Sequence, residues 1–183
     1  ELSRGLVDVY KRQHYKLEEG ILSMDLDVIN QADETLPYGI GFHPWLAREE
    51  DSQLQFSAIG CWLEDSRHLP TEHMVPGSGS TSDFRESNGF PHGLLNNAYT
   101  GWDGIAELMR PQHGLKVHVK AADPLRCLQI YSLSVDADFV CVELVNYTLD
   151  AQNNVGKPGM VCPKCLENGE SLSVTCSIEP QEL

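Results

Sequence analysis

Glu143 stands in sequence surroundings that suit acid/base chemistry. It lies within FVCVELVN, an apolar stretch of the chain. An acid among apolar residues either has a partner or faces a pocket, because burying an unpaired carboxylate is costly. Burial would raise the pKa of this carboxyl towards neutrality, which suits a general base that works near pH 7. The alternative is an edge-strand Glu143 that points into solvent.

His43 is the second candidate for proton transfer. It lies in LPYGIGFHPWL, after two glycines, between aromatic residues and directly before Pro44. Proline disfavours helical backbone in the residue before it, so we expect His43 on extended chain at a strand end. An imidazole held in this way can donate or accept a proton near neutral pH. The alternative is a structural His43 whose ring is satisfied by a backbone carbonyl.

Alternating polarity predicts the strands that must position these side chains. Apolar residues occupy every second position in several segments, as in half-buried strands. The segments with this pattern are 21–28, 53–58, 115–120 and 171–178. Residues 127–132 and 139–145 are apolar at nearly every position, as in strands covered on both faces. Because no segment longer than about ten residues keeps a helical period, the chain is predicted to be all-β, with antiparallel strands in a sandwich or barrel.

Length and charge limit the classes of function. The chain has 183 residues, which predicts one domain. Its 13 Lys and Arg against 27 Asp and Glu give a net charge of −14. Such a chain has no basic stripe for phosphates or anionic lipid, so we expect neither nucleic acid nor a membrane as a partner. Residues Pro70 to Pro91 are rich in Gly, Ser and Pro and are predicted to form one long loop.

The first residues are expected to lie outside the domain. The segment GLVDVYKRQ, residues 5 to 13, resembles adapter-derived translations at the ends of assembled sequence fragments. A genuine amphipathic leader is the alternative. We therefore expect residues 1–13 to be a non-native or disordered leader.

The six cysteines favour a reducing compartment. Cys127, Cys141 and Cys176 lie inside strand-like segments, where thiols behave as small hydrophobic side chains. This spacing is more typical of a cytoplasmic protein than of a secreted, disulfide-bonded one. Cys162 and Cys165 form a single CxxC pair, and a structural zinc site needs four ligands, so we expect a plain loop there.

Several segments together resemble the aldose 1-epimerase (galactose mutarotase) family. They are PYGIGFHPWL, LNNAYTGWDGIAEL, LQIYS and FVCVELVNYTLDAQNN, followed by a closing LENGESLSVTCSIEP. The resemblance extends from about Leu17 to the end of the chain. It implies a galactose-mutarotase-like β-supersandwich, an antiparallel all-β fold. It also implies that residues 14–183 are the C-terminal portion of a single β-sandwich domain, with little activity of their own.

The resemblance implies roles for particular residues. The family's general acid, a His, falls on His43, and its general base, a Glu, falls on Glu143. Its substrate-binding Gln falls on Gln129 in LQIYS. Its sugar-binding Asp falls on Asn96 in NNAY, where Asn keeps the hydrogen-bonding shape but lacks the charge. The family's further Arg and His belong to its N-terminal half and are not expected among these residues.

A sugar usually also needs an aromatic surface to stack on. We expect Trp102 to be substrate-binding, with Trp45 as a further candidate. Phe42 and Tyr99 are also candidates, although a place in the core is more typical of both.

We therefore expect an aldose 1-epimerase, an isomerase that interconverts the α and β anomers of a free aldose by general acid/base ring opening. Its expected partner is a small sugar, and neither a metal nor another cofactor is required. The alternative is a non-catalytic carbohydrate-binding β-sandwich, or a mutarotase-like accessory domain of a glycoside hydrolase. A pocket shared by His43 and Glu143 favours the enzyme, whereas side chains on opposite faces favour the alternative.

Overall fold

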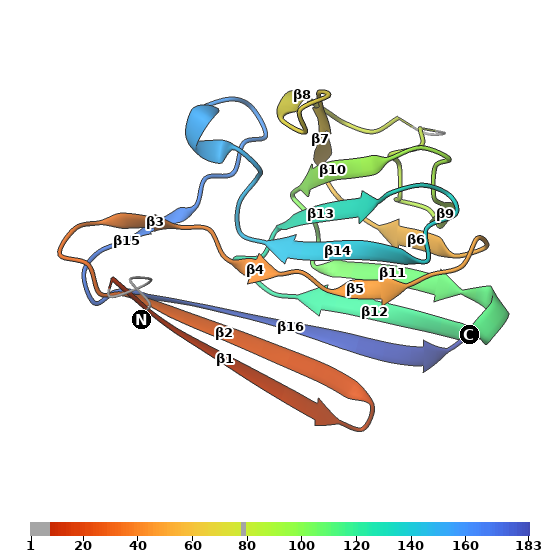
Figure 1. Ribbon diagram of the computed structural model, residues 1–183, viewed down its shortest axis with the longest axis horizontal. Coiled ribbons are helices and arrows are strands. Elements are labelled where there is room, and N and C mark those ends of the chain that lie inside the picture. Colours follow the sequence, from red (N-terminus) through yellow and green to blue (C-terminus); the bar gives the residue numbers. More distant parts are fainter. Residues whose placement is uncertain (1–7, 78–79) are drawn as a thin grey trace, which may run out of the picture.

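The computed structural model describes residues 8–77 and 80–183, which form two large antiparallel sheets and a short ribbon (Figure 1). The first sheet contains, in spatial order, β1 (Val9–Glu18), β2 (Ile21–Asn30), β16 (Ser171–Glu182), β12 (Leu115–Ala121), β11 (Ile105–Arg110), β6 (Gln53–Phe56) and β9 (Asn88–Gly89). The second sheet contains β4 (Gly41–Phe42), β14 (Phe139–Val145), β13 (Cys127–Ser132), β10 (Leu95–Thr100), β7 (Gly60–Glu64) and β8 (Pro70–Met74), and β5 (Trp45–Ala47) also pairs with β14. The ribbon consists of β3 (Leu36–Tyr38) and β15 (Lys164–Leu166).

The polarity pattern correctly predicted six of these strands and the all-β class. They are β2, β6, β12, β13, β14 and β16. β6 ends at Phe56, two residues earlier than expected, because the chain then leaves the first sheet for the second. The short 3-10 helices η1 (Pro111–His113) and η2 (Ala151–Asn153) connect strands. Within the described residues, we find no helix of the length and apolar character that a membrane span needs.

One hydrophobic core joins the inner faces of the two sheets. It includes Leu54 and Leu108 of the first sheet, and Tyr99, Ile130 and Val142 of the second. Because side chains alternate along a strand, the neighbours of the second group point to the opposite face of the second sheet. That outer face is where the polar candidate residues lie.

The predicted loop Pro70 to Pro91 contains two short strands. β8 pairs with β7 at the edge of the second sheet, and β9 pairs with β6 at the edge of the first. Pro70 is the first residue of β8, a position that tolerates the missing N–H of proline. The prediction of one continuous loop was therefore wrong for these two segments.

Part of the predicted leader belongs to the first sheet. Val9 to Gln13 form the first half of β1, which pairs with β2 in an unbroken antiparallel register. This differs from the expectation that residues 1–13 lie outside the domain, because the long β2 offers hydrogen-bonding partners along its whole edge. Residues 1–7 lie outside the described part of the chain.

The buried cysteines lie where the sequence predicts them. Cys127, Cys141 and Cys176 are buried on β13, β14 and β16. Burial raises the pKa of Cys127 and of Cys176 to about 12, and that of Cys141 to about 11. These thiols therefore stay protonated near neutral pH.

An ion pair connects the two sheets beside this core. Glu49, just after β5, accepts hydrogen bonds from Arg110 at the end of β11, with a distance of 3.0 Å between Nε and Oε2. His113 Nε2 lies 3.0 Å from the other carboxylate oxygen. The hydrogen bonds from Arg110 lower the pKa of Glu49 to about 2.

We expect this carboxylate to stabilise the fold only above acidic pH. A folded-state pKa of about 2, below the usual 4.5, means that the stabilisation is complete above 4.5 and is lost as pH falls towards 2. Urea unfolding from pH 2 to 6 should therefore show less acid destabilisation in Glu49→Gln than in the unmodified protein. Parallel curves for the two proteins would contradict this role of Glu49.

Candidate active site

A row of side chains crosses the outer face of the second sheet and contains the two predicted acid/base residues. Glu143 of β14 lies opposite Gln129 of β13, and Gln129 lies opposite Ala98 of β10. On its other side, β14 pairs with β4 and β5, which leave only His43 and Pro44 between them. The backbone pairs that β4 and β5 form with β14, before and after this link, place His43 directly across from Glu143.

The local sequence explains how His43 reaches this place. Pro44 has no N–H and interrupts the strand, yet its carbonyl still accepts from the N–H of Val142 at 3.3 Å, so the register is kept. Gly41 lies so close to β14 that a Cβ there would be 2.1 Å from the carbonyl oxygen of Leu144. A glycine at this position therefore permits the close approach of β4 to β14.

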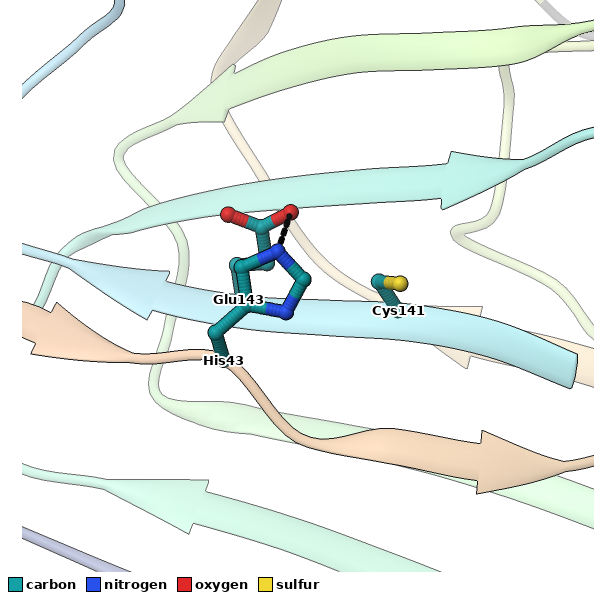
Figure 2. Close-up of side chains that lie close together, drawn as sticks. All are labelled: His43, Cys141 and Glu143. Carbon is teal, nitrogen blue, oxygen red and sulfur yellow. Dashed lines mark ion pairs between the residues drawn. The ribbon is translucent and has the colours of Figure 1, made fainter.

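The side chains of His43 and Glu143 point towards one another (Figure 2). Nε2 of His43 lies 2.9 Å from Oε1 of Glu143. The indole N–H of Trp45 donates to Nδ1 of His43 at 3.1 Å, so the proton of a neutral imidazole is on Nε2, next to the carboxylate. Trp45 itself stacks on Phe139, with 4.4 Å between ring centroids.

The surroundings of Glu143 favour its protonated form. Its side chain is 20% exposed, and β14 is flanked by strands on both sides, which excludes the edge-strand alternative. Burial raises the pKa of Glu143, and the charge of His43 acts in the opposite direction. A carboxyl with a raised pKa beside an imidazole is suited to exchange protons near neutral pH.

Gln129 and Asn96 extend the site along the sheet. Nε2 of Gln129 donates to Oδ1 of Asn96 at 2.6 Å, and Nδ2 of Asn96 donates to Oε2 of Glu64 on β7 at 2.6 Å. A cavity of about 200 Å³ lies over this part of the sheet. It is lined by Asn96, Ala98, Cys127, Leu128, Gln129, Glu143, Val145, Tyr147 and Leu149. The small side chain of Ala98, in the middle of the row, leaves room for this cavity.

The chain matches a known protein family over most of its length. A family model described as aldose 1-epimerase matches residues 7–179. The chain belongs to the aldose 1-epimerase family. The fold is the galactose-mutarotase-like β-sandwich that the sequence predicts, because solved structures described as a candidate aldose 1-epimerase and as a galactose mutarotase-like protein superpose on it closely.

Three proteins illustrate its relation to other aldose 1-epimerase family members. A solved structure from Escherichia coli K12, described as a candidate aldose 1-epimerase, is 28% identical, with a TM-score of 0.84 over 96% of this chain and 64% of its own. A galactose mutarotase-like protein from Clostridium acetobutylicum is 17% identical, with a TM-score of 0.77 over 96% of this chain and 63% of its own. The curated protein YphB of E. coli K12 is 30% identical over 75% of this chain and 49% of its own length. The chain thus spans about half the length of the curated relative it matches.

Trp102 is not part of the site. It is 1% exposed, belongs to the hydrophobic core, and donates its indole N–H to the carbonyl of Ile105 at 2.9 Å. The expectation that it binds substrate is not met, because it follows β10 into the turn to β11 and packs between the sheets. Phe42 and Tyr99 are also buried in the core, whereas Trp45 is 63% exposed beside His43.

Glu64 and Phe139 were not predicted from the sequence, although the position of each in the alternation of its strand indicates which face it occupies. Glu64 follows Trp62 at a spacing of two in CWLED, so it faces the same side of the sheet as Ala98. Phe139 lies four residues before Glu143 on β14, hence on the same face, and it supports Trp45. Tyr147 and Leu149, which lie beyond the end of β14, have no such pattern.

The site also contains possible metal ligands. His43, Cys141 and Glu143 offer donor atoms within 4.8 Å of one another (Figure 2). Zinc ligands in a tetrahedral site lie about 3.3 to 3.8 Å apart, the indole of Trp45 occupies Nδ1 of His43, and burial keeps the Cys141 thiol protonated. The arrangement thus favours an acid/base pair over a metal centre. Cys162 and Cys165 are exposed and belong to no group of three possible ligands in the described residues.

Proposed function

We propose that the protein interconverts the α and β anomers of a free aldose, with Glu143 as general base and His43 as general acid. The observation that carries the proposal is the 2.9 Å approach of His43 Nε2 to Glu143 Oε1 on the outer face of the second sheet. The amide side chains of Gln129 and Asn96 lie beside this pair and line the adjoining cavity.

The reaction needs one group of each kind. The base removes the proton of the anomeric hydroxyl while the acid protonates the ring oxygen, and the bond between the anomeric carbon and the ring oxygen breaks. The resulting aldehyde rotates about its bond to C2, and the ring closes on the other face with the proton transfers reversed. Because the anomeric hydroxyl and the ring oxygen are attached to one carbon, acid and base must lie close together, as His43 and Glu143 do.

His43 would donate through Nε2, the ring nitrogen that lies next to Glu143. In the structure, Nδ1 accepts a hydrogen bond from Trp45, which is the arrangement of a neutral ring. The sugar then separates His43 from Glu143 and contacts both.

The chemistry of the cavity supports a neutral sugar as substrate. Glu143, Gln129 and Asn96 supply hydrogen-bonding groups, and Tyr147 supplies an aromatic ring. The net charge of −14 disfavours a phosphorylated sugar. A cytoplasmic location remains an expectation from the cysteine pattern.

Mutarotation of freshly dissolved α-galactose and α-glucose, followed by polarimetry or NMR, tests the proposal. Since the chain covers 64% of the E. coli structure, the measurement uses a protein of full family length that contains it. We expect anomer exchange faster than the uncatalysed rate. Sugar binding without acceleration would instead favour the carbohydrate-binding alternative.

We expect the activity to fall in acid because of Glu143. A base works only when deprotonated, and burial raises the pKa of this carboxyl above the usual 4.5. The kcat/KM of mutarotation should therefore decline about tenfold per pH unit on the acid side of a midpoint that lies above 4.5. The pH–rate profile, corrected at each pH for buffer-catalysed mutarotation, measures this limb. A flat profile down to pH 4.5 would contradict the assignment of Glu143 as base.

A further inference from the structure

We propose that Glu64 is a positioning residue that sets the orientation of the Asn96 and Gln129 side chains, and through them the hydrogen-bonding pattern offered to the sugar. The expected effect of Glu64 on catalysis rests on the proposed function. The orientation itself is a property of the protein without sugar. A carboxylate on the neighbouring strand β7 thus lies directly beside Asn96.

The direction of the hydrogen-bond chain follows from the chemistry of Glu64. A carboxylate only accepts hydrogen bonds, so Asn96 must present its Nδ2 to Oε2 of Glu64, at 2.6 Å. This turns Oδ1 of Asn96 towards Gln129, which must then present Nε2, again at 2.6 Å. Oε1 of Gln129, which lines the cavity beside Glu143, is left as an acceptor for a sugar hydroxyl.

The strand geometry brings Glu64 to Asn96. Ala98 pairs with Trp62, and two residues further along each strand Asn96 and Glu64 reach the same face. The register of β7 against β8 shifts between Leu63 and Glu64, with the extra residue, Thr71, on β8, so Glu64 keeps the alternation of β7. The Glu64 side chain is only 19% exposed, so its contact with Asn96 is well shielded from water.

A second contact holds the other carboxylate oxygen. Nδ1 of His68 lies 2.9 Å from Oε1 of Glu64. His68 has a left-handed backbone, with φ of 62°, in the turn that follows β7. Both oxygens of Glu64 are thus engaged, and the carboxylate cannot turn away from Asn96 without losing a partner.

This arrangement makes Asn96 and Glu64 a matched pair. An Asp at position 96 would place two carboxylates in contact, and one of them would have to take up a proton or move away. We therefore expect Asn96→Asp to impair the site. In a Glu64→Gln background, Asn96→Asp should restore the site. The amide introduced at position 64 can then donate a hydrogen bond to the carboxylate introduced at position 96. Gln129 continues to donate to the other oxygen of that carboxylate.

Steady-state mutarotation of four proteins tests the consequence for the sugar. They are the unmodified protein, Glu64→Gln, Asn96→Asp and the double variant, all of full family length. We expect each single variant to raise KM about tenfold or more with kcat changed less than about threefold, and the double variant to return towards the original KM. The matched control is Glu72→Gln on β8, whose exposed carboxylate is one strand further away, and its KM should not change.

The orientation is tested without sugar by 15N NMR of the side-chain amides. Glu64→Gln should shift the signals of both Asn96 and Gln129, whereas Glu72→Gln should shift neither. An unchanged Gln129 signal would overturn the proposed orientation, whatever the activity. The positioning role would be overturned, with the proposed function intact, if an active Glu64→Gln variant kept the original KM. It would also be overturned if the increases in KM of the two single variants simply added in the double variant. Shifted amide signals in a protein that does not catalyse mutarotation would instead refute the proposed function and support the orientation.

Discussion

Glu143→Gln and His43→Asn are each expected to lower kcat for mutarotation by about 10²- to 10⁴-fold, the range for loss of one correctly placed acid or base. Gln at position 143 has nearly the same shape as Glu but cannot take the proton from the anomeric hydroxyl. Asn at position 43 can still hydrogen-bond but cannot protonate the ring oxygen. Polarimetry of α-galactose with each variant, in a protein of full family length, measures both losses.

Matched substitutions away from the site separate this effect from general damage. Glu72→Gln and His92→Asn change the same residue types at exposed positions and should leave kcat unchanged. Urea unfolding should show that the site variants remain folded, and Glu143→Gln is expected to be at least as stable as the unmodified protein at neutral pH, because burial penalises the ionised form of Glu143. A Glu143→Gln protein that keeps more than about a tenth of its activity would contradict the role of this carboxylate as base.

Arg48→Ala is expected to lower the free energy of unfolding by about 3 to 5 kcal/mol, the range for breaking a buried hydrogen-bond network. Arg48 is 3% exposed, and it donates to the carbonyls of Phe139 and Val135 at 3.3 and 3.2 Å and to the hydroxyl of Ser132 at 3.1 Å. Its guanidinium also lies 4.3 Å from the ring centroid of Phe90. Without Arg48, the segment that leads into β14 loses a hydrogen-bond donor to several part-buried carbonyls.

Urea unfolding of Arg48→Ala, Arg48→Lys and Arg67→Ala measures this contribution. Lys keeps the charge but lacks the planar set of donors, so its loss should be intermediate. Arg67 is exposed and, among the described residues, its side chain bonds to Asp65 of its own turn, so its removal should cost less than about 1 kcal/mol. If Arg48→Ala were as mild as Arg67→Ala, the network around Arg48 would not stabilise the fold.

The strands themselves could be predicted because their polarity repeats at the period of the backbone. Residues 127–132 and 139–145 are apolar enough to indicate covered strands, and they are β13 and β14. Glu143 could be singled out because an acid is rare in such surroundings. The short strands β4, β5 and β9 are two or three residues long, which is too short for any periodicity to be visible.

Trp102 shows where reasoning from residue type fails. An aromatic residue near NNAY suits both a sugar-binding surface and a core, and the sequence offers no way to choose between them. The turn from β10 to β11 carries Trp102 between the sheets, where burial of a large ring stabilises the fold more than exposure would. Trp45, by contrast, is held at the surface because β5 is a short strand that covers the edge of β14.

The all-β class, the family, and the choice of His43 and Glu143 as acid/base candidates could be predicted from the amino-acid sequence alone. Local polarity and the residues that flank a side chain are sufficient for these, since they depend on short-range order along the chain. The folded chain was needed to show that His43 contacts Glu143, that Trp102 lies in the core, and that Glu64, 32 residues before Asn96, places a carboxylate beside it. The physical reason is register: which side chains meet across strands depends on pairings between distant segments, and a shift of one residue would turn each of them to the other face.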